Sequence, residues 1–274
     1  MANDYGEHLV IRLKARTPRA NPKLTTNQVR AFWAAWGGWT MDGMDSFIYS
    51  LILVPALREL LPRSGIPSTT ANMGLYGGLM FSLLLVGWGL AVVWGPIADR
   101  YGRVRTLTLT VLWFSVFTLL SAFVTNIWQL AVLRLLAGIG IGGEWGMGAS
   151  LVAEAWPEER RVMGGSLVHT GYYFGFFLAA IANYFIGSHF GWRYMFVVGG
   201  VPALVVVFLR RGIHEPDRWK YKREELKQKF RMHHSFLAIF APQYRRRSIL
   251  NATFMLASII GLWGGSVYVP TAIT

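Results

Sequence analysis

The chain has 274 residues, of which 53% are hydrophobic and only 15% are charged. A soluble domain of ordinary composition carries about 25% charged residues, so the composition argues against a soluble globular enzyme. Because the chain has no cysteine, disulfides, thiolate metal sites and cysteine nucleophiles are excluded as well.

The N-terminal segment, residues 1–30, is polar and basic and has neither an apolar core nor a small-residue cleavage pattern. We therefore expect no cleavable signal peptide in this segment. The first membrane-spanning helix, which follows it, is expected to act as the targeting signal.

Long apolar runs without Asp, Glu, Lys or Arg follow, at Gly74 to Ala98, Thr106 to Leu133, Val162 to Gly187 and Ser248 to Thr274. Each run is long enough to cross a hydrocarbon layer of about 30 Å as a helix. Barrel strands would alternate apolar and polar residues, so unbroken runs favour helices. The runs and their polar breaks predict seven spanning helices, at 31–56, 74–97, 106–125, 128–153, 163–187, 191–209 and 249–273, with a tight turn at 125–126.

Basic residues gather on one side of this predicted topology. Only Arg58, Arg63 and Arg193 lie on the opposite side, and Arg134 lies within the fourth helix, out of 27 Lys and Arg residues. The positive-inside rule makes the basic side, and with it the N-terminus, cytoplasmic. The net charge of +13 therefore lies where the anionic lipid of the cytoplasmic leaflet attracts it. The sequence contains no aromatic-basic motif that would indicate nucleic-acid binding. We expect a multi-pass protein of the cell membrane.

Residues 210–248 form a basic loop between the sixth and seventh predicted helices. Trp219, Leu226 and Phe230 recur there at helical spacing. A helix on the membrane surface and a solvated linker are both compatible with this pattern.

The first predicted helix places two acids near the middle of the bilayer. Asp42 lies ten residues beyond Phe32, about 15 Å along the axis, and Asp45, three residues later, shares its face. Ionised carboxylates are costly at that depth, so at least one of the two is expected to bind a proton. Proton coupling needs such a group. The alternative is a structural role in which hydroxyls or water satisfy both acids.

The fourth predicted helix holds Arg134 and, about 15 Å further along its axis, Glu144. Arg134 would either attract a substrate carboxylate or neutralise an acid of the first helix, and both readings stay open. Glu144 is either a gating or coupling acid or a structural partner of Trp or Ser groups. In the fifth helix, Tyr172 could line a polar path and His169 could relay protons, although a structural histidine is the stronger interpretation.

The glycines in these predicted helices are spaced as expected where two helices pack closely against each other. Gly138, Gly140 and Gly143 formally match a dinucleotide-binding pattern, but they lie inside an apolar span with no strand before them. Close helix packing explains them better. Gly171 and Gly175 have the same small-residue spacing, and we expect packing there too.

The segment from Gly95 to Arg105 resembles the signature loop of the major facilitator superfamily, and departs from it at Val104, where a second basic residue is usual. Gly95 and Gly102 are expected to permit a tight turn, and Asp99 to accept hydrogen bonds from an arginine or a helix N-terminus. In the family this acid braces the two halves of the protein in the outward-facing state. The resemblance therefore implies a gating motif, made of Gly95, Asp99, Arg100, Gly102 and Arg103.

A second resemblance runs through the fourth helix, where four residues fall at the spacings of the family's sugar-transporter signature: Gly138, Gly142, Glu154 and Arg161. The surrounding sequence, and the acids at 42 and 45, look like the organic-acid branch of proton symporters for sialate, lactate and aromatic acids. After the sixth helix, Glu215 opens a looser relative of the Pro-Glu-Ser-Pro-Arg element of sugar porters.

The resemblance implies an all-α membrane protein with the N-terminal six-helix bundle of the superfamily at 31–209 and a seventh helix at 249–274 that begins a second bundle of a twelve-helix fold. It implies proton-coupled symport of a small organic anion by alternating access, with no enzyme activity, no metal and no cofactor beyond the proton. The implied partners are the lipid bilayer and a monocarboxylate, sialate-like or aromatic acid. The alternatives are a sugar transporter of the same superfamily, and a non-transporting fragment or subunit that self-associates or pairs with a separate second half.

Overall fold

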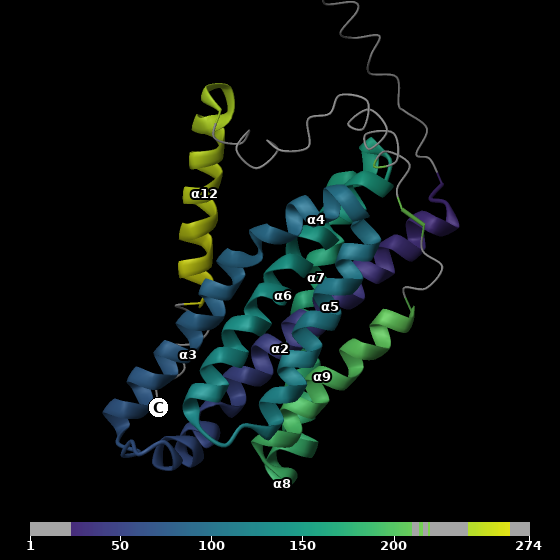
Figure 1. The fold of residues 1–274 in the computed structure, drawn as a ribbon. Coiled ribbons are helices and arrows are strands. Elements are labelled where there is room, and N and C mark those ends of the chain that lie inside the picture. Colours follow the sequence, from purple (N-terminus) through teal and green to yellow (C-terminus); the bar gives the residue numbers. More distant parts are fainter. Residues whose placement is uncertain (1–22, 210–213, 216–218, 220–240, 264–274) are drawn as a thin grey trace, which may run out of the picture.

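The computed structural model describes residues 23–209, 214–215, 219 and 241–263, and the regular structure in these ranges is entirely helical (Figure 1). This confirms the predicted fold class. The longer helices are α2 (Thr26–Arg63), α3 (Thr70–Leu90), α4 (Trp94–Tyr101), α5 (Arg103–Leu120), α6 (Ile127–Ala155), α7 (Arg161–Ala182), α9 (Trp192–Leu209) and α12 (Pro242–Trp263). Short turns join some of them, namely η1 (Ala91–Val93), η2 (Ser121–Phe123), η3 (Glu158–Arg160), η4 (Asn183–Gly187) and α8 (Ser188–Phe190).

Polar caps set the starts of several helices. The Thr25 hydroxyl accepts from the backbone N–H of Gln28, whose side chain accepts in return from the Thr25 N–H, which is a complete capping box. The Asn126 side chain caps α6 by accepting from the backbone N–H of Gln129, without a reciprocal bond to the Asn126 N–H. These caps begin α2 five residues before the predicted start and confirm the tight turn between α5 and α6.

The second predicted helix differs most from the structure. α3, η1 and α4 continue one another from Thr70 to Tyr101, so Gly95 lies inside a helix and not in a turn. Pro96 falls in the first turn of α4, where its missing N–H loses no helical hydrogen bond. Only Gly102 makes the turn, at φ 114°, in the region that favours glycine. The prediction that both glycines permit the turn is therefore wrong for Gly95.

The last predicted helix begins earlier than expected, at Pro242, and the structure follows it to Trp263. The segment 1–22, most of the basic loop and residues 264–274 lie outside the described residues. The prediction of a surface helix around Leu226 and Phe230 falls in that part of the chain.

Glycines let the helices of the bundle approach closely, as the sequence predicts. A Cβ on Gly175 of α7 would overlap the Thr40 carbonyl oxygen and the Met44 backbone nitrogen of α2. On α6, a Cβ on Gly138 would overlap the Leu84 carbonyl of α3, and one on Gly140 would reach the Phe114 backbone of α5. Small residues thus bring α2 against α7, and α6 against both α3 and α5.

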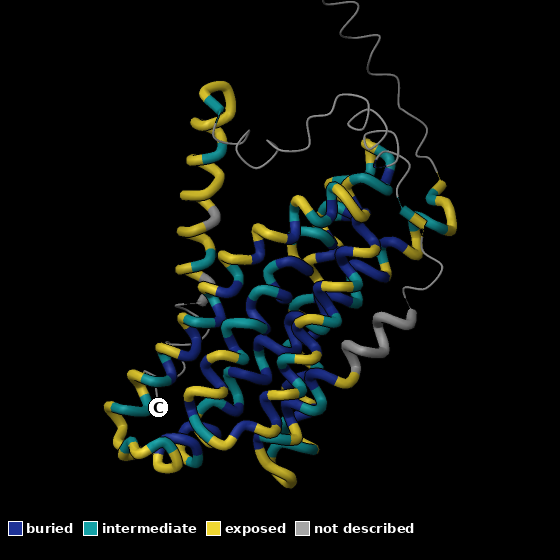
Figure 2. The backbone as a smooth tube through the Cα atoms, viewed as in Figure 1, coloured by how far each residue is buried: buried dark blue, intermediate teal, exposed yellow. Residues whose placement is uncertain are grey.

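The buried residues lie where the helices face one another, as expected for a membrane bundle (Figure 2). The interior is lined by buried residues, whereas large apolar side chains such as Leu75, Val86, Val132 and Phe177 are exposed on the outside. Within the described residues, four helical stretches are long and apolar enough to cross a membrane, namely Thr70–Tyr101, Arg103–Phe123, Ile127–Ala155 and Glu158–Phe190. Helix α2 is longer still, and in its middle Thr40, Asp42, Asp45 and Ser46 are buried.

Candidate functional site

A buried ion pair lies in the middle of the bundle. Arg134 Nη1 of α6 lies 3.6 Å from Asp45 Oδ2 of α2, and neither side chain is accessible to solvent. The Nη2 of Arg134 donates to the Ser121 hydroxyl at 2.8 Å. The guanidinium also lies over the rings of Tyr49 and Phe196, with 5.6 and 4.8 Å to their centroids. Of the two readings left open for Arg134, this geometry matches neutralisation of an acid of the first helix.

Asp42 is also buried, with 3% exposure, one turn before Asp45 on α2. Trp39, three residues before Asp42, contacts two rings of α7 edge-on. The ring centroid of Trp39 lies 4.4 Å from that of His169 and 6.5 Å from that of Tyr172. The structure thus brings His169 and Tyr172 to the α2 segment that carries the acids. It pairs His169 with an aromatic ring.

Glu144 lies elsewhere in the bundle. It is fully buried on α6, and the Thr110 hydroxyl of α5 donates to its Oε2 at 3.0 Å. Arg134 lies ten residues away on the same helix, about 15 Å along the axis, so the structure keeps Glu144 apart from the pair with Asp45.

The predicted gating motif meets the fourth-helix signature at the basic end of the bundle, which we define by Arg100, Arg103, Arg105, Arg160 and Arg161. Arg103 Nη1 donates to Asp99 Oδ1 at 2.7 Å, and its Nε and Nη2 donate to Glu154 at 3.1 to 3.2 Å. One guanidinium therefore joins α4, α5 and the end of α6.

The remaining residues of these motifs have other positions. Arg100 is exposed, with its guanidinium 5.4 Å from the centroid of the Tyr101 ring. A Cβ on Gly142 would overlap α3 and η1, at Trp88 and Ala91. Arg161 is the first residue of α7.

Glu215 completes the basic end. Its carboxylate accepts from the first three backbone N–H groups of α5, those of Arg103, Val104 and Arg105, at 2.7 to 3.2 Å. A carboxylate is favoured at a helix N-terminus by the helix dipole and the unpaired N–H groups. Gly102, whose φ of 114° favours glycine, lies directly against this carboxylate, and a Cβ there would push the Glu215 side chain aside. The sequence marks Glu215 only as the start of a looser relative of the Pro-Glu-Ser-Pro-Arg element, and it gives no indication that this acid caps α5.

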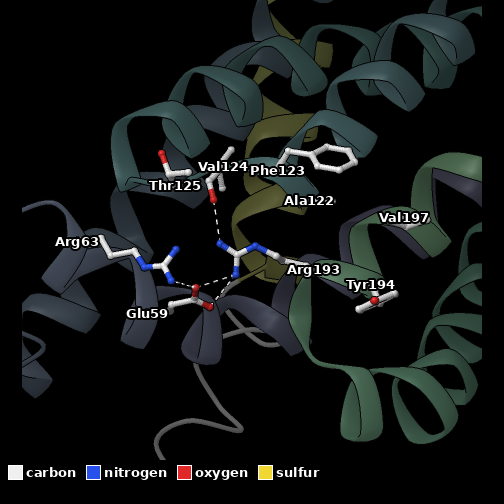
Figure 3. Close-up of a pocket in the computed structure, with 9 residues that line it drawn as sticks. All are labelled: Glu59, Arg63, Ala122, Phe123, Val124, Thr125, Arg193, Tyr194 and Val197. Carbon is white, nitrogen blue, oxygen red and sulfur yellow. Dashed lines mark hydrogen bonds and ion pairs between the residues drawn. The ribbon is translucent and has the colours of Figure 1, made fainter.

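A second ionic cluster at the opposite end was missed. Glu59 of α2 accepts from Arg193 and from the Trp192 indole of α9 at 2.7 to 2.8 Å, and pairs with Arg63 at 2.9 Å (Figure 3). Arg193 also donates to the Val124 carbonyl in the turn before α6. Glu59, Arg63, Val124 and Arg193 line an open pocket of about 710 Å³. Sequence analysis used the arginines only to count charge.

Glu59 lies beyond the predicted apolar span 31–56, and its pKa is perturbed. Burial acts to raise the pKa of this carboxyl, but the hydrogen bonds from Arg193 and Trp192 and the charges of Arg193 and Arg63 outweigh it and lower the pKa. The cluster therefore holds an ionised carboxylate that ties α2 to α9 and to the turn before α6.

Comparisons with known proteins identify the family. A model of the Major Facilitator Superfamily matches residues 35–274. The chain is 39% identical over 210 residues to a Haemophilus influenzae protein provisionally named for metabolite transport, covering 73% of this chain and 48% of that protein. It is 33% identical over 209 residues to the 4-hydroxybenzoate transporter PcaK of Pseudomonas putida, and the match covers 74% of this chain and 43% of that transporter. It is 29% identical over 213 residues to the sialic acid transporter NanX of Escherichia coli, and the match covers 78% of this chain and 49% of that transporter.

A solved structure shares the fold. The xylose transporter XylE of Escherichia coli, in a partially occluded inward-open conformation, matches with a TM-score of 0.63 and 20% identity over 84% of this chain and 58% of that one. The chain spans about half the length of the curated relatives it matches. The helical bundle, its apolar outer surface and these matches together show that the chain is a multi-pass membrane protein and belongs to the major facilitator superfamily of transporters.

Proposed function

We propose that this chain provides the proton-coupling half of a symporter that carries a small organic anion by alternating access. The observation that carries the proposal is the buried pair of Asp45 and Arg134. A carboxylate and a guanidinium in a water-free bundle stabilise each other, and protonation of the acid removes that stabilisation. The protonation state of Asp45 therefore decides whether the charge of Arg134 is balanced inside the bundle.

An anionic substrate fits this arrangement. When Asp45 takes up a proton, Arg134 keeps its charge and lacks its partner, so a substrate carboxylate is attracted to the same layer of the bundle. Because Arg134 is fully enclosed in the described state, the substrate reaches it only after the helices move. Relatives named for 4-hydroxybenzoate and sialic acid, which are both carboxylic acids, support this substrate class.

The basic end supplies a gate in this proposal. Asp99, Arg103 and Glu154 join the ends of three helices, and Glu215 fixes the start of α5. In this proposal the network holds the three helix ends together while that end of the transporter opens and closes against a second bundle. We propose that the basic end faces the cytoplasm of a cell membrane, as the distribution of Lys and Arg indicates.

The test is uptake of radiolabelled 4-hydroxybenzoate and sialic acid into proteoliposomes with an imposed inward proton gradient. The 274-residue chain is compared with the same chain joined to the carboxyl-terminal bundle of a relative. Asp42→Asn and Asp45→Asn are expected to abolish proton-driven accumulation, whereas Glu158→Gln, at an exposed acid, leaves it unchanged. Unimpaired accumulation by both aspartate variants would refute the assignment.

The same assay separates the alternatives. A sugar transporter, to which the XylE fold likeness points, would take up labelled xylose and neither of the two acids. A non-transporting fragment or subunit would give no uptake in either form. Uptake by the 274-residue chain alone would mean that it completes a pathway by self-association.

A further inference from the structure

A stripe of buried hydroxyl groups runs along α5. Thr106, Thr110 and Thr118 are all inaccessible to solvent, as is Ser121 in the turn that follows. They lie three, four or eight residues apart and therefore share one face of the helix. Burying hydroxyl groups is costly unless they bond to something. The stripe begins beside Arg103 at the basic end and reaches Ser121, which binds Arg134.

Thr110 links this stripe to Glu144. Its Oγ1 lies 3.0 Å from Glu144 Oε2 and 2.9 Å from the Leu107 carbonyl oxygen. A hydroxyl has one proton to donate. If Glu144 is ionised, that proton points to Oε2. If Glu144 carries a proton, the carboxyl O–H donates to Oγ1 and the Thr110 hydroxyl turns to the Leu107 carbonyl. Both protonation states are satisfied by rotation of one O–H bond.

Phe114 divides the stripe. It occupies the position between Thr110 and Thr118 on the same face, and it is fully buried. Thr118 belongs with the central acid, since its Cγ2 and Asp45 Oδ1 both lie 3.4 Å from the Cβ position of Gly199. The two threonines are about 12 Å apart along the axis. The bundle thus holds two separate polar layers, one around Asp45 and one around Glu144.

We propose that Glu144 and Thr110 form a second proton-binding site, in series with Asp45, and that protons pass between Asp45 and the basic end along the inside of the bundle, past Phe114. This inference rests on the proposed function and adds a proton route separate from the path of the substrate. The proton that leaves Asp45 is accepted by the Glu144 carboxylate and is then released past Thr106 to solvent water at the basic end. No other group changes its covalent structure.

Other charges surround Glu144 at a distance. Thr110 is seven residues from Arg103, about 10 Å along α5. Along the described parts of the helices that pack against α6, the charged and titratable side chains are Arg30, Asp42, Asp45, Tyr49, Arg58, Glu59 and Arg63 on α2, Tyr76 on α3, Asp99, Arg100 and Tyr101 on α4, Arg103 and Arg105 on α5, and Arg161, His169, Tyr172 and Tyr173 on α7.

Infrared spectroscopy of the purified 274-residue chain tests the proton site without requiring transport. The wild type is expected to show, on acidification, a C=O stretch of a protonated carboxyl group that Glu144→Gln removes. Thr110→Val, which deletes the hydroxyl, shifts the frequency of this band, and Thr110→Ser restores it. Thr108→Val is the matched control, because the Thr108 hydroxyl donates only to the Val104 carbonyl among the bonds of this part of α5. If the band is unchanged in both Glu144→Gln and Thr110→Val, the proposed site is wrong.

Uptake by the chain joined to a second bundle tests the route. Glu144→Gln is expected to lower gradient-driven accumulation at least 10-fold and to leave substrate exchange without a gradient intact. Equal accumulation by the variant and the wild type would overturn the route and leave the proposed function standing. Absence of uptake in the wild type, together with loss of the infrared band in Glu144→Gln, would mean that the proton site exists and that the proposed function fails.

Discussion

Three kinds of contact surround the guanidinium of Arg134, which is inaccessible to solvent. Asp45 supplies the opposite charge, Ser121 accepts a hydrogen bond, and the rings of Tyr49 and Phe196 offer their negative faces. Burying both partners of an ion pair costs desolvation energy that their attraction only partly returns. The pair is therefore a poor source of stability, and its place in the bundle is better explained by function.

A double-mutant cycle tests this argument. Arg134→Met alone leaves Asp45 buried without its cation and is expected to cost about 3–5 kcal/mol, and Asp45→Asn alone is expected to cost a similar amount. The double variant should recover most of the loss, because an uncharged pair needs no compensation. Thermal unfolding in detergent measures all four proteins. Losses that simply add in the double variant would show that the two side chains do not interact.

At the scale of helices, the contact of α2 with α7 is expected to tolerate no added atom. Gly175→Ala places a methyl group against the backbone of α2 and should cost about 1–3 kcal/mol through overpacking. Gly165→Ala, on the same helix, meets no described atom within 4 Å and should gain up to about 1 kcal/mol from helix propensity. Opposite signs of the shift in unfolding temperature are the expected result. Equal shifts would contradict the close contact.

The cluster around Glu59, which joins α2, α9 and the turn before α6, predicts a pH dependence. Because the pKa of Glu59 is lower in the folded protein than the value of about 4.3 in an unfolded chain, its ionised form stabilises the fold. This contribution is complete above pH of about 4.3 and is lost as the pH falls through the folded pKa. Its size is about 1 kcal/mol or less, since the side chains are about one-third exposed.

Thermal unfolding of the wild type and of Glu59→Gln across this range measures the effect. The two should differ at neutral pH and converge in acid. A difference that stays constant from neutral to acid pH would contradict the assignment to this carboxyl. Glu158→Gln, at an exposed acid, serves as the control.

Sequence predicted the elements better than the ionic clusters, for a physical reason. The apolar runs and the glycine spacing are local patterns, and they located the helices and the packing of Gly138 and Gly175. Helix ends were missed by up to seven residues, because caps and not hydropathy decide them. The roles of Glu59 and Glu215 depend on partners more than a hundred positions away in sequence, and no local spacing reports such contacts.

At the scale of the whole molecule, two ionic clusters close the ends of a bundle whose middle holds buried charge. The cluster of Glu59 lies at one end, the network of Arg103 and Glu215 at the other, and the pair of Asp45 and Arg134 between them. The chain spans about half the length of such relatives. Rigid ends around a charged middle suit a body that moves as a unit against a partner bundle.

The absence of cysteine makes the orientation of this body directly measurable. Ser68→Cys lies in the exposed turn between α2 and α3, and Arg105→Cys lies at the basic end. Because basic segments are retained on the cytoplasmic side, a membrane-impermeant maleimide is expected to label Ser68→Cys in intact cells and Arg105→Cys only after permeabilisation. Glu158→Cys, at the same end as Arg105, should behave like Arg105→Cys. The reverse pattern would place the N-terminus outside the cell, and labelling of all three in intact cells would contradict a spanning bundle.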